Sequence, residues 1–160
     1  MRLKILAFLL CLGLIPPAAM AATPEELDGL IAKYAATYNV PETLIRRIIK
    51  RESNYDPSAY SRGHWGLMQI KHQTAQSMGY RGSAKGLLDA ETNLIYGVKY
   101  LAGAYLVADG NEARAVRFYS SGYYYDAKRK GLLDETGLGR DRKARHKKKS
   151  KRLTNVKNFK

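Results

Sequence analysis

Cysteine and histidine are scarce in this chain of 160 residues. It has one cysteine and three histidines, which excludes an intrachain disulfide framework and a zinc or redox site of the Cys-x-x-Cys type. The histidines occur without a His-Glu-x-x-His motif, so no metal site is indicated. The glycine-rich signatures GxxxxGK[ST], GxGxxG and GxSxG are also missing, which argues against nucleotide binding and serine-hydrolase chemistry. We therefore predict no metal and no cofactor.

Acidic residues are also few, 14 against 28 basic ones, which gives a net charge of +14. Most of the excess lies in residues 140–160, which hold eleven lysines and arginines against one acid and carry +10. This basic tail is poor in apolar residues, so we predict that it is disordered when free. It is either a solubilising extension or a contact with an anionic wall or membrane surface. The remaining body, residues 22–139, carries only +2.

The first 21 residues are typical of a secretory signal peptide. Two early basic residues precede an apolar run over residues 5–15, which is too short to span a membrane comfortably. The sequence Ala-Met-Ala at residues 19–21 matches a signal-peptidase site, so we place the cleavage before Ala22. Cys11 would leave with the signal. An uncleaved anchor is the alternative. A periplasmic or secreted protein is therefore expected, and nucleic acid is not expected as a partner.

The body is predicted to form one mainly α-helical domain over residues 22–139. Thr23, Pro24 and Glu26 form the pattern of a helix start, with Thr23 and Glu26 as a capping box. No stretch shows the sustained alternation typical of strands. Apolar spacing predicts further helices over residues 41–53, 66–78 and 93–108 and one ending at Gly122, with loops at 54–64 and 79–86.

Glu52 occupies an unusual place in the second predicted helix. At about 100° per residue, its side chain falls near the centre of the apolar stripe, while four basic residues occupy the opposite face. A carboxyl group partly removed from water favours its protonated form and can act as a general acid. Two other interpretations stay open: the helix ends before Glu52, or Arg47 or Arg51 folds back onto it. The apolar stripe consists of Leu44, Ile45, Ile48 and Ile49.

An ordered set of short motifs follows Glu52 and extends to Gly122. It comprises Glu-Ser, a later serine before a loop, Gly-Leu-Met-Gln, Asn-x-x-x-Gly-x-x-Tyr-Leu and a final Tyr-x-x-Gly. Over residues 41–131 this set resembles the lytic transglycosylase domain of the soluble murein transglycosylases (glycoside hydrolase family 23), which is related to goose-type lysozyme. The matching residues are Glu52, Ser53, Ser61, Gly66, Leu67, Met68, Gln69, Asn93, Gly97, Tyr100, Leu101, Tyr119 and Gly122.

The resemblance departs from the family pattern in two places. The family motif Ala-Tyr-Asn-Ala-Gly is replaced by Phe-Tyr-Ser-Ser-Gly at residues 118–122. This keeps the tyrosine and the glycine but loses the asparagine, so any role of that asparagine is in doubt here. The loop between Ser61 and Gly66 is also short, which can reshape one wall of the substrate groove.

The resemblance implies a lysozyme-like helical fold and a peptidoglycan lytic transglycosylase. In such enzymes one glutamate, here Glu52, protonates the bond between N-acetylmuramic acid and N-acetylglucosamine. It then deprotonates the sugar's 6-hydroxyl, which closes a 1,6-anhydro ring without adding water. Substrate-binding positions follow from the motifs and from aromatic residues that suit sugar rings; they are Ser61, Met68, Gln69, Tyr119 and Tyr124. The alternatives are an ordinary loop serine for Ser61, a capping glutamine for Gln69 and a buried role in the core for Met68 and Tyr119.

Two further acids are candidates for a second carboxylate, but neither is given a catalytic role. Asp56 precedes a proline in a predicted turn, and Glu91 lies in the first turn of a predicted helix, where an acid is favoured anyway. The alternatives to a transglycosylase are a lysozyme-like hydrolase of the same bond and a catalytically silent wall-binding module. We also expect a monomer that acts on glycan strands. An envelope-spanning secretion machine is a candidate partner.

Overall fold

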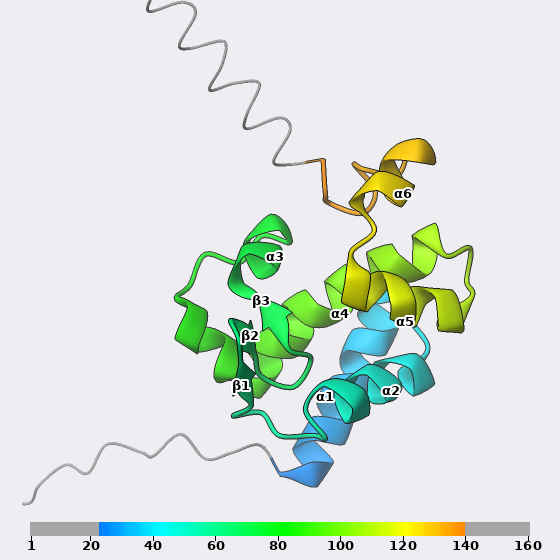
Figure 1. Cartoon of the computed structure of the whole chain (residues 1–160). Helices are drawn as coiled ribbons and strands as arrows, with labels where there is room; N and C mark the ends of the chain where they lie inside the picture. Colours follow the sequence, from blue (N-terminus) through cyan, green and yellow to red (C-terminus); the bar gives the residue numbers. More distant parts are fainter. Residues whose placement is uncertain (1–22, 140–160) are drawn as a thin grey trace, which may run out of the picture.

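The computed structural model describes residues 23–139, and the signal-peptide and basic-tail predictions lie outside these residues. The described part is mainly helical, as predicted, and adds a small sheet of three two-residue strands (Figure 1). The elements in chain order are α1 (Pro24–Tyr38), α2 (Glu42–Glu52), β1 (Tyr60–Ser61), β2 (His64–Trp65), β3 (Ile70–Lys71), α3 (His72–Ser77), the 3-10 helix η1 (Ala84–Leu88), α4 (Ala90–Val107), α5 (Glu112–Ser121) and α6 (Tyr124–Arg129).

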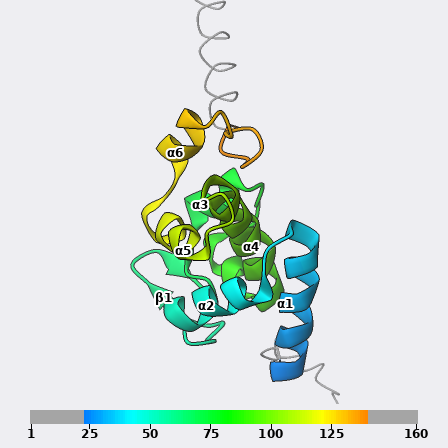
Figure 2. The same ribbon diagram turned by 90° about the vertical axis from the view of Figure 1, so that its right-hand side faces the viewer.

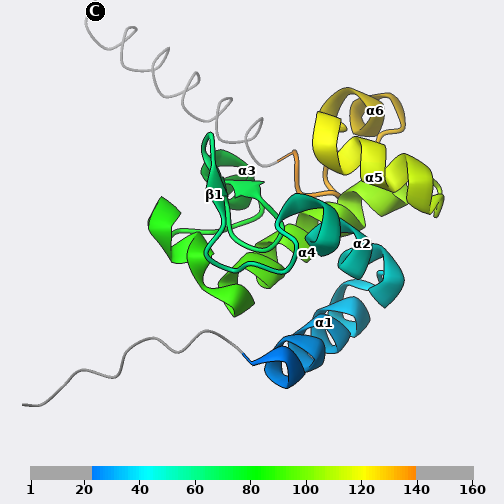
Figure 3. The same cartoon turned by 60° about the horizontal axis from the view of Figure 1, so that its bottom comes forward.

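Helix α4 runs through the middle of the domain. The sheet and α3 lie near one end of it, α5 and α6 near the other, and α1 and α2 lie along its side (Figures 1 and 3). Most buried residues of α4 fall at spacings of three and four along one broad face, while Leu106 is 46% exposed. The fully buried side chains of the main core include Ile31, Leu44, Ile45, Ile48, Ile49, Leu67, Leu94, Val98 and Leu101.

The predicted start of the first helix is confirmed. The backbone N–H of Glu26 donates to Thr23 Oγ1 at 3.2 Å, and the Thr23 N–H donates to Glu26 Oε2 at 2.8 Å, which is a complete capping box. The helix ends at Asn39, whose φ of 52° is left-handed. Helix α2 follows and packs its predicted apolar stripe into the core; Figure 2 shows α1 and α2 side by side.

The helix predicted over residues 66–78 is wrong in its first half. Residues 66–69 form turns, β3 follows, and only His72–Ser77 is helical. Gly66 has a φ of +65° and Gln69 a φ of +45°, which a right-handed helix cannot contain. A side chain at Gly66 would also lie 2.4 Å from both Asn93 Nδ2 and the Leu87 carbonyl oxygen. Tertiary contacts therefore override local helical spacing in this segment.

Three smaller differences concern the elements around α4. It begins at Ala90, three residues earlier than predicted, because the Asp89 side chain accepts from the Thr92 N–H at 2.8 Å and caps it. The 3-10 helix η1 lies partly within the loop predicted at 79–86, and α6 was not predicted. The three strands were not predicted, because a strand of two residues is too short to show an alternation of apolar and polar side chains.

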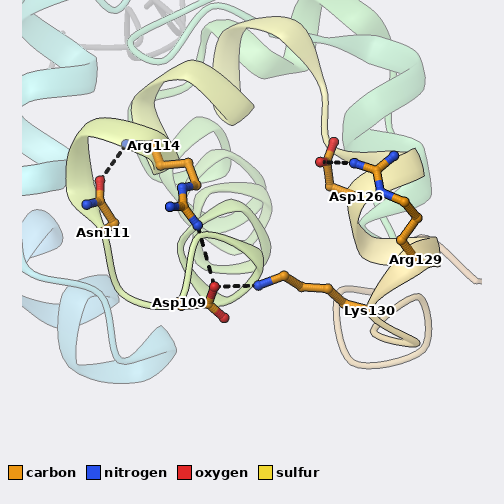
Figure 4. A network of polar contacts seen from close by, with 6 residues as sticks. All are labelled: Asp109, Asn111, Arg114, Asp126, Arg129 and Lys130. Carbon is orange, nitrogen blue, oxygen red and sulfur yellow. Dashed lines mark hydrogen bonds and ion pairs between the residues drawn. The ribbon is translucent and has the colours of Figure 1, made fainter.

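Polar contacts hold α6 against the turn between α4 and α5 (Figure 4). The Asp109 carboxylate in this turn lies 2.5 Å from Lys130 Nζ, directly after α6, and 3.5 Å from Arg114 on α5. Asn111 caps α5 by accepting from the Arg114 N–H at 2.9 Å. These side chains are largely exposed, so each ion pair contributes little by itself.

Within residues 23–139 no helix combines the length and apolar character needed to cross a membrane.

Candidate active site

A cavity of about 370 Å³ opens beside the carboxyl end of α2 and contains Glu52. Its walls come from α2, from β2 and β3 with the one residue before β3, and from α3, α4 and the end of α5. Among the lining residues from the described part of the chain, Glu52 is the only acid. The lining residues are Arg51, Glu52, His64, Gln69, Ile70, Lys71, Thr74, Tyr100, Tyr119, Ser120, Ser121 and Gly122.

Glu52 is the last residue of α2, so the interpretation in which the helix ends before it is wrong. Its side chain is 23% exposed, and Oε1 lies 3.8 Å from Arg51 Nε. The sequence left open whether Arg47 or Arg51 folds back onto Glu52, and in the structure Arg51 lies against it. Arg51 is itself 55% exposed, so water screens this pair and it does not seal the carboxylate away from a substrate.

The residue after Glu52 fixes the end of α2 to the segment of residues 65–69. Ser53 Oγ donates to the Leu67 carbonyl oxygen at 2.8 Å, and its backbone N–H donates to the Ile49 carbonyl oxygen at 3.0 Å. The first contact joins the 65–69 segment to α2 directly beside Glu52. The position of the carboxylate relative to the cavity wall is thus set by a hydrogen bond between residues 14 apart in the sequence.

The 65–69 segment is also held from α4. Asn93 is fully buried and uses both ends of its side-chain amide. Its Oδ1 accepts from the Met68 N–H at 2.8 Å, and its Nδ2 donates to the carbonyl oxygens of Trp65 and Leu87 at 2.7 Å each. Buried backbone groups that lie outside helices and sheets need such partners. The Asn93 side chain therefore supplies the hydrogen-bond partners that these backbone groups would find in a neighbouring strand if they belonged to a sheet.

Tyr119 fastens the same segment from α5. Its hydroxyl donates to the Met68 carbonyl oxygen at 2.8 Å, and its side chain is buried. Burial raises the pKa of Tyr119 well above its ordinary value of 10, and the nearby charge of Glu52 raises that pKa further. The ring of Tyr100 meets that of Tyr119 edge to face at 5.4 Å, and burial raises the pKa of Tyr100 to about 12. Both phenols therefore stay protonated at neutral pH.

The structure brings only some of the predicted binding residues to the cavity. Gln69 lines it, although its Nε2 already donates to the carbonyl oxygens of Ala59 and Gly66 at 3.0 Å each. Tyr119 lines it as well. Met68 is fully buried and does not line the cavity, because its side chain covers Gly97, where a Cβ would lie 2.6 Å from Met68 Sδ. The alternative interpretation of Met68 as a core residue is thus the one that the structure favours.

Two other predicted residues lie outside the cavity lining. Tyr124 is 40% exposed on α6, with its ring against Tyr125 at 5.4 Å. Ser61 is exposed in β1, and its partner across β1 and β2 is His64, which does line the cavity. Ser61 accordingly sits one strand away from the wall. The second acids considered from the sequence, Asp56 and Glu91, do not line the cavity either.

Sequence reasoning missed several lining residues. Ser120 and Ser121 directly follow Tyr119, so the motif itself could have suggested them. His64 and Lys71 face each other across β2 and β3, and no periodic pattern specifies the register of strands two residues long. Tyr100 was noted as part of a helix motif but not as a residue of the site.

Comparison with known proteins places these residues in a family context. Residues 29–134 match the family described as the transglycosylase SLT domain. The chain is 34% identical over 103 residues to peptidoglycan transglycosylase gp16 of Escherichia phage T7. This match covers 62% of this chain and 8% of that protein. It is 37% identical over 94 residues to membrane-bound lytic murein transglycosylase C of Yersinia pestis and of Yersinia pseudotuberculosis, covering 49% of this chain and 26% of theirs.

The chain thus spans about a quarter or less of the length of these curated relatives. No solved structure matches it. Within residues 23–139 no group of three or more histidine, cysteine or acidic side chains is arranged to hold a metal ion.

Proposed function

Because the chain belongs to the SLT transglycosylase domain family, we propose that it is a peptidoglycan lytic transglycosylase with Glu52 as its catalytic residue. It cleaves the bond between N-acetylmuramic acid and N-acetylglucosamine without adding water and leaves 1,6-anhydromuramic acid ends. The names of its relatives, which include a peptidoglycan transglycosylase and a lytic murein transglycosylase, support the substrate. The signal-peptide pattern of residues 1–21 supports action in the periplasm or outside the cell.

The observation that carries this proposal is the single acid in the cavity. Most glycosidases need two carboxylates on opposite sides of the scissile bond. Glu52 is the only acid among the lining residues from 23–139. Asp56 instead accepts from the backbone N–H of Ser58 at 2.8 Å in a turn, and Glu91 accepts from Lys33 and Tyr34 at 2.8 Å each. The chemistry must therefore draw its second function from the substrate.

The proton moves in a cycle that one carboxyl group can complete. Protonated Glu52 gives its proton to the glycosidic oxygen, the bond from that oxygen to C1 of the muramic acid breaks, and the substrate's N-acetyl oxygen stabilises the developing cation. The Glu52 carboxylate then takes the proton of the 6-hydroxyl while O6 bonds to C1. The anhydro ring closes, and Glu52 is protonated again. No water enters and none leaves, so atoms and charges balance.

The remaining residues act by holding this geometry. The hydrogen bonds that join Ser53, Asn93 and Tyr119 to the 65–69 segment hold it beside Glu52, so the carboxylate and the cavity wall keep one relative position. The amide oxygen of Gln69 and the hydroxyls of Ser120 and Ser121 supply hydrogen-bonding groups for sugar. We assign Ser61 and Tyr124 to outer parts of a bound strand, since neither lines the cavity.

Mass spectrometry of muropeptides released from purified sacculi tests the proposal. The protein without residues 1–21 should release products one water lighter than their hydrolysed forms, and Glu52→Gln should release none. Glu91→Gln is the matched control. Because Glu91 lies outside the cavity, this variant should keep full turnover. Hydrated products would show a lysozyme-like hydrolase instead. A folded protein that binds sacculi but releases nothing, with or without Glu52, would be a wall-binding module.

A further inference from the structure

The cavity around Glu52 holds more positive charge than its one acid can balance. Arg51 and Lys71 both line it, and Glu52 is the only acid among its lining residues from 23–139. Arg51 lies against Glu52, with 3.8 Å between Nε and Oε1. Lys71 has no ion pair with any acid in the described part of the chain. Among residues 23–139, the Lys71 ammonium group in the cavity wall is therefore left without a counter-charge.

The small sheet places Lys71 and His64 opposite each other beside the cavity. In the register of the strands, Lys71 lies opposite His64, and His64 lies opposite Ser61. Residues opposite each other share a face of a sheet, so these three form one row, of which His64 and Lys71 line the cavity. The next row contains Tyr60, Trp65 and Ile70, and of these Ile70 also lines the cavity. His64 Nδ1 donates to the Ser61 carbonyl oxygen at 3.1 Å, since a carbonyl can only accept.

A positive group without a partner in a concave wall favours an anionic ligand. The field of a positive charge in a cleft attracts anions, and water around the exposed Lys71 screens part of this attraction. The N-acetylated sugars of a peptidoglycan strand are themselves uncharged. The anions of that polymer are carboxylates on the lactyl arm of muramic acid. They are either the lactyl carboxylate itself, where no peptide is attached, or the carboxylates of an attached peptide.

We propose that Lys71 is a specificity-determining residue that binds a carboxylate on the lactyl arm of muramic acid. This inference rests on the proposed function. The ammonium group attracts that carboxylate and so selects which strands, and which muramic acid residues, enter the cavity beside Glu52. Because Lys71 is exposed and water remains nearby, we expect an effect of about fivefold on kcat/KM, the size of one partly screened ion pair. Added salt should weaken it.

The test compares three forms of the same glycan strands. The first are intact strands with their peptides, and the second are strands stripped of peptide by an amidase, which keep the lactyl carboxylate. The third are intact strands whose carboxylates have been converted to amides, which keep the bulk of the peptide but lose its charge. Wild type, Lys71→Gln and Lys85→Gln are assayed on all three. Lys85 is an exposed lysine of η1 outside the cavity, so it controls for loss of surface charge.

We expect Lys71→Gln to lower kcat/KM about fivefold on intact strands and to have no such effect on amidated ones, where wild type should already be slow. An equal loss on stripped strands shows that Lys71 also binds the free lactyl carboxylate, whereas a loss confined to intact strands identifies the carboxylates of the peptide as its ligand. Equal effects of Lys71→Gln on charged and amidated strands, or a similar loss in Lys85→Gln, would overturn the inference. If wild type cleaves none of the three, the proposed function itself fails.

Discussion

Replacing Asn93 by alanine should destabilise the domain far more than the loss of an ordinary surface asparagine. The side chain is fully buried and makes three hydrogen bonds of 2.7–2.8 Å to backbone groups of Trp65, Met68 and Leu87. Alanine leaves all three groups without that partner. A buried polar group left unpaired costs roughly 1–3 kcal/mol. A water molecule that enters the vacated space can recover part of this.

We therefore expect Asn93→Ala to lower the free energy of unfolding by about 3 kcal/mol or more, a large fraction of the roughly 5–15 kcal/mol typical of a domain. The matched control is Asn111→Ala. Asn111 is exposed and accepts a single hydrogen bond, from the Arg114 N–H at the start of α5, so its loss should cost about 1 kcal/mol. Urea unfolding followed by circular dichroism measures both differences, provided that the slope m is the same in each variant.

The comparison between the two variants decides the argument. If Asn93→Ala were no more destabilising than Asn111→Ala, the 65–69 segment would not depend on the Asn93 amide. Asn93→Asp is a second test, because it keeps the acceptor for the Met68 N–H but loses both donated hydrogen bonds and buries a charge. It should be at least as destabilising as alanine.

Two further predictions concern Tyr119 and Asp109. Tyr119→Phe leaves the Met68 carbonyl oxygen unpaired and should cost about 1–2 kcal/mol of stability while lowering kcat on sacculi well beyond the unfolded fraction; an unchanged kcat would contradict the positioning role. Hydrogen bonding to Lys130 lowers the pKa of Asp109 below its ordinary value of 3.8, so its stabilisation is complete at neutral pH and is lost as the pH falls below 3.8 through the lowered pKa. The difference in stability between wild type and Asp109→Asn should therefore shrink from pH 7 to pH 2 in urea unfolding, and a constant difference would refute the ion pair.

Much of the helical framework could be predicted from the sequence because it depends on neighbours within one turn. The capping box of Thr23 and Glu26 joins residues three apart, and the place of Glu52 on the apolar face of α2 follows from a spacing of three to four residues. These local rules placed Glu52 on that face, and the resemblance to the lytic transglycosylase family then identified it as the residue that we propose as the catalytic acid. They did not show that Arg51 lies against it, since rotamers at a helix end depend on what surrounds them.

The segment beside Glu52 could not be predicted in the same way. Its helical spacing was misleading, because Gly66 takes a left-handed conformation under the side chain of Asn93, 27 residues further along the chain. Two-residue strands carry no alternation, so the pairing of His64 with Lys71 was invisible before the chain was folded.

Contacts within a few residues set the helical class of the domain, the start of α1 and the place of Glu52 on α2, so these three features follow from the order of the amino acids. Three other features appear only once the chain has packed: Met68 is buried over Gly97, the Tyr119 hydroxyl binds a backbone carbonyl 51 residues away, and Lys71 shares a cavity with Glu52. Such contacts depend on how the helices pack around α4, and helix packing joins residues whose separation no local period encodes.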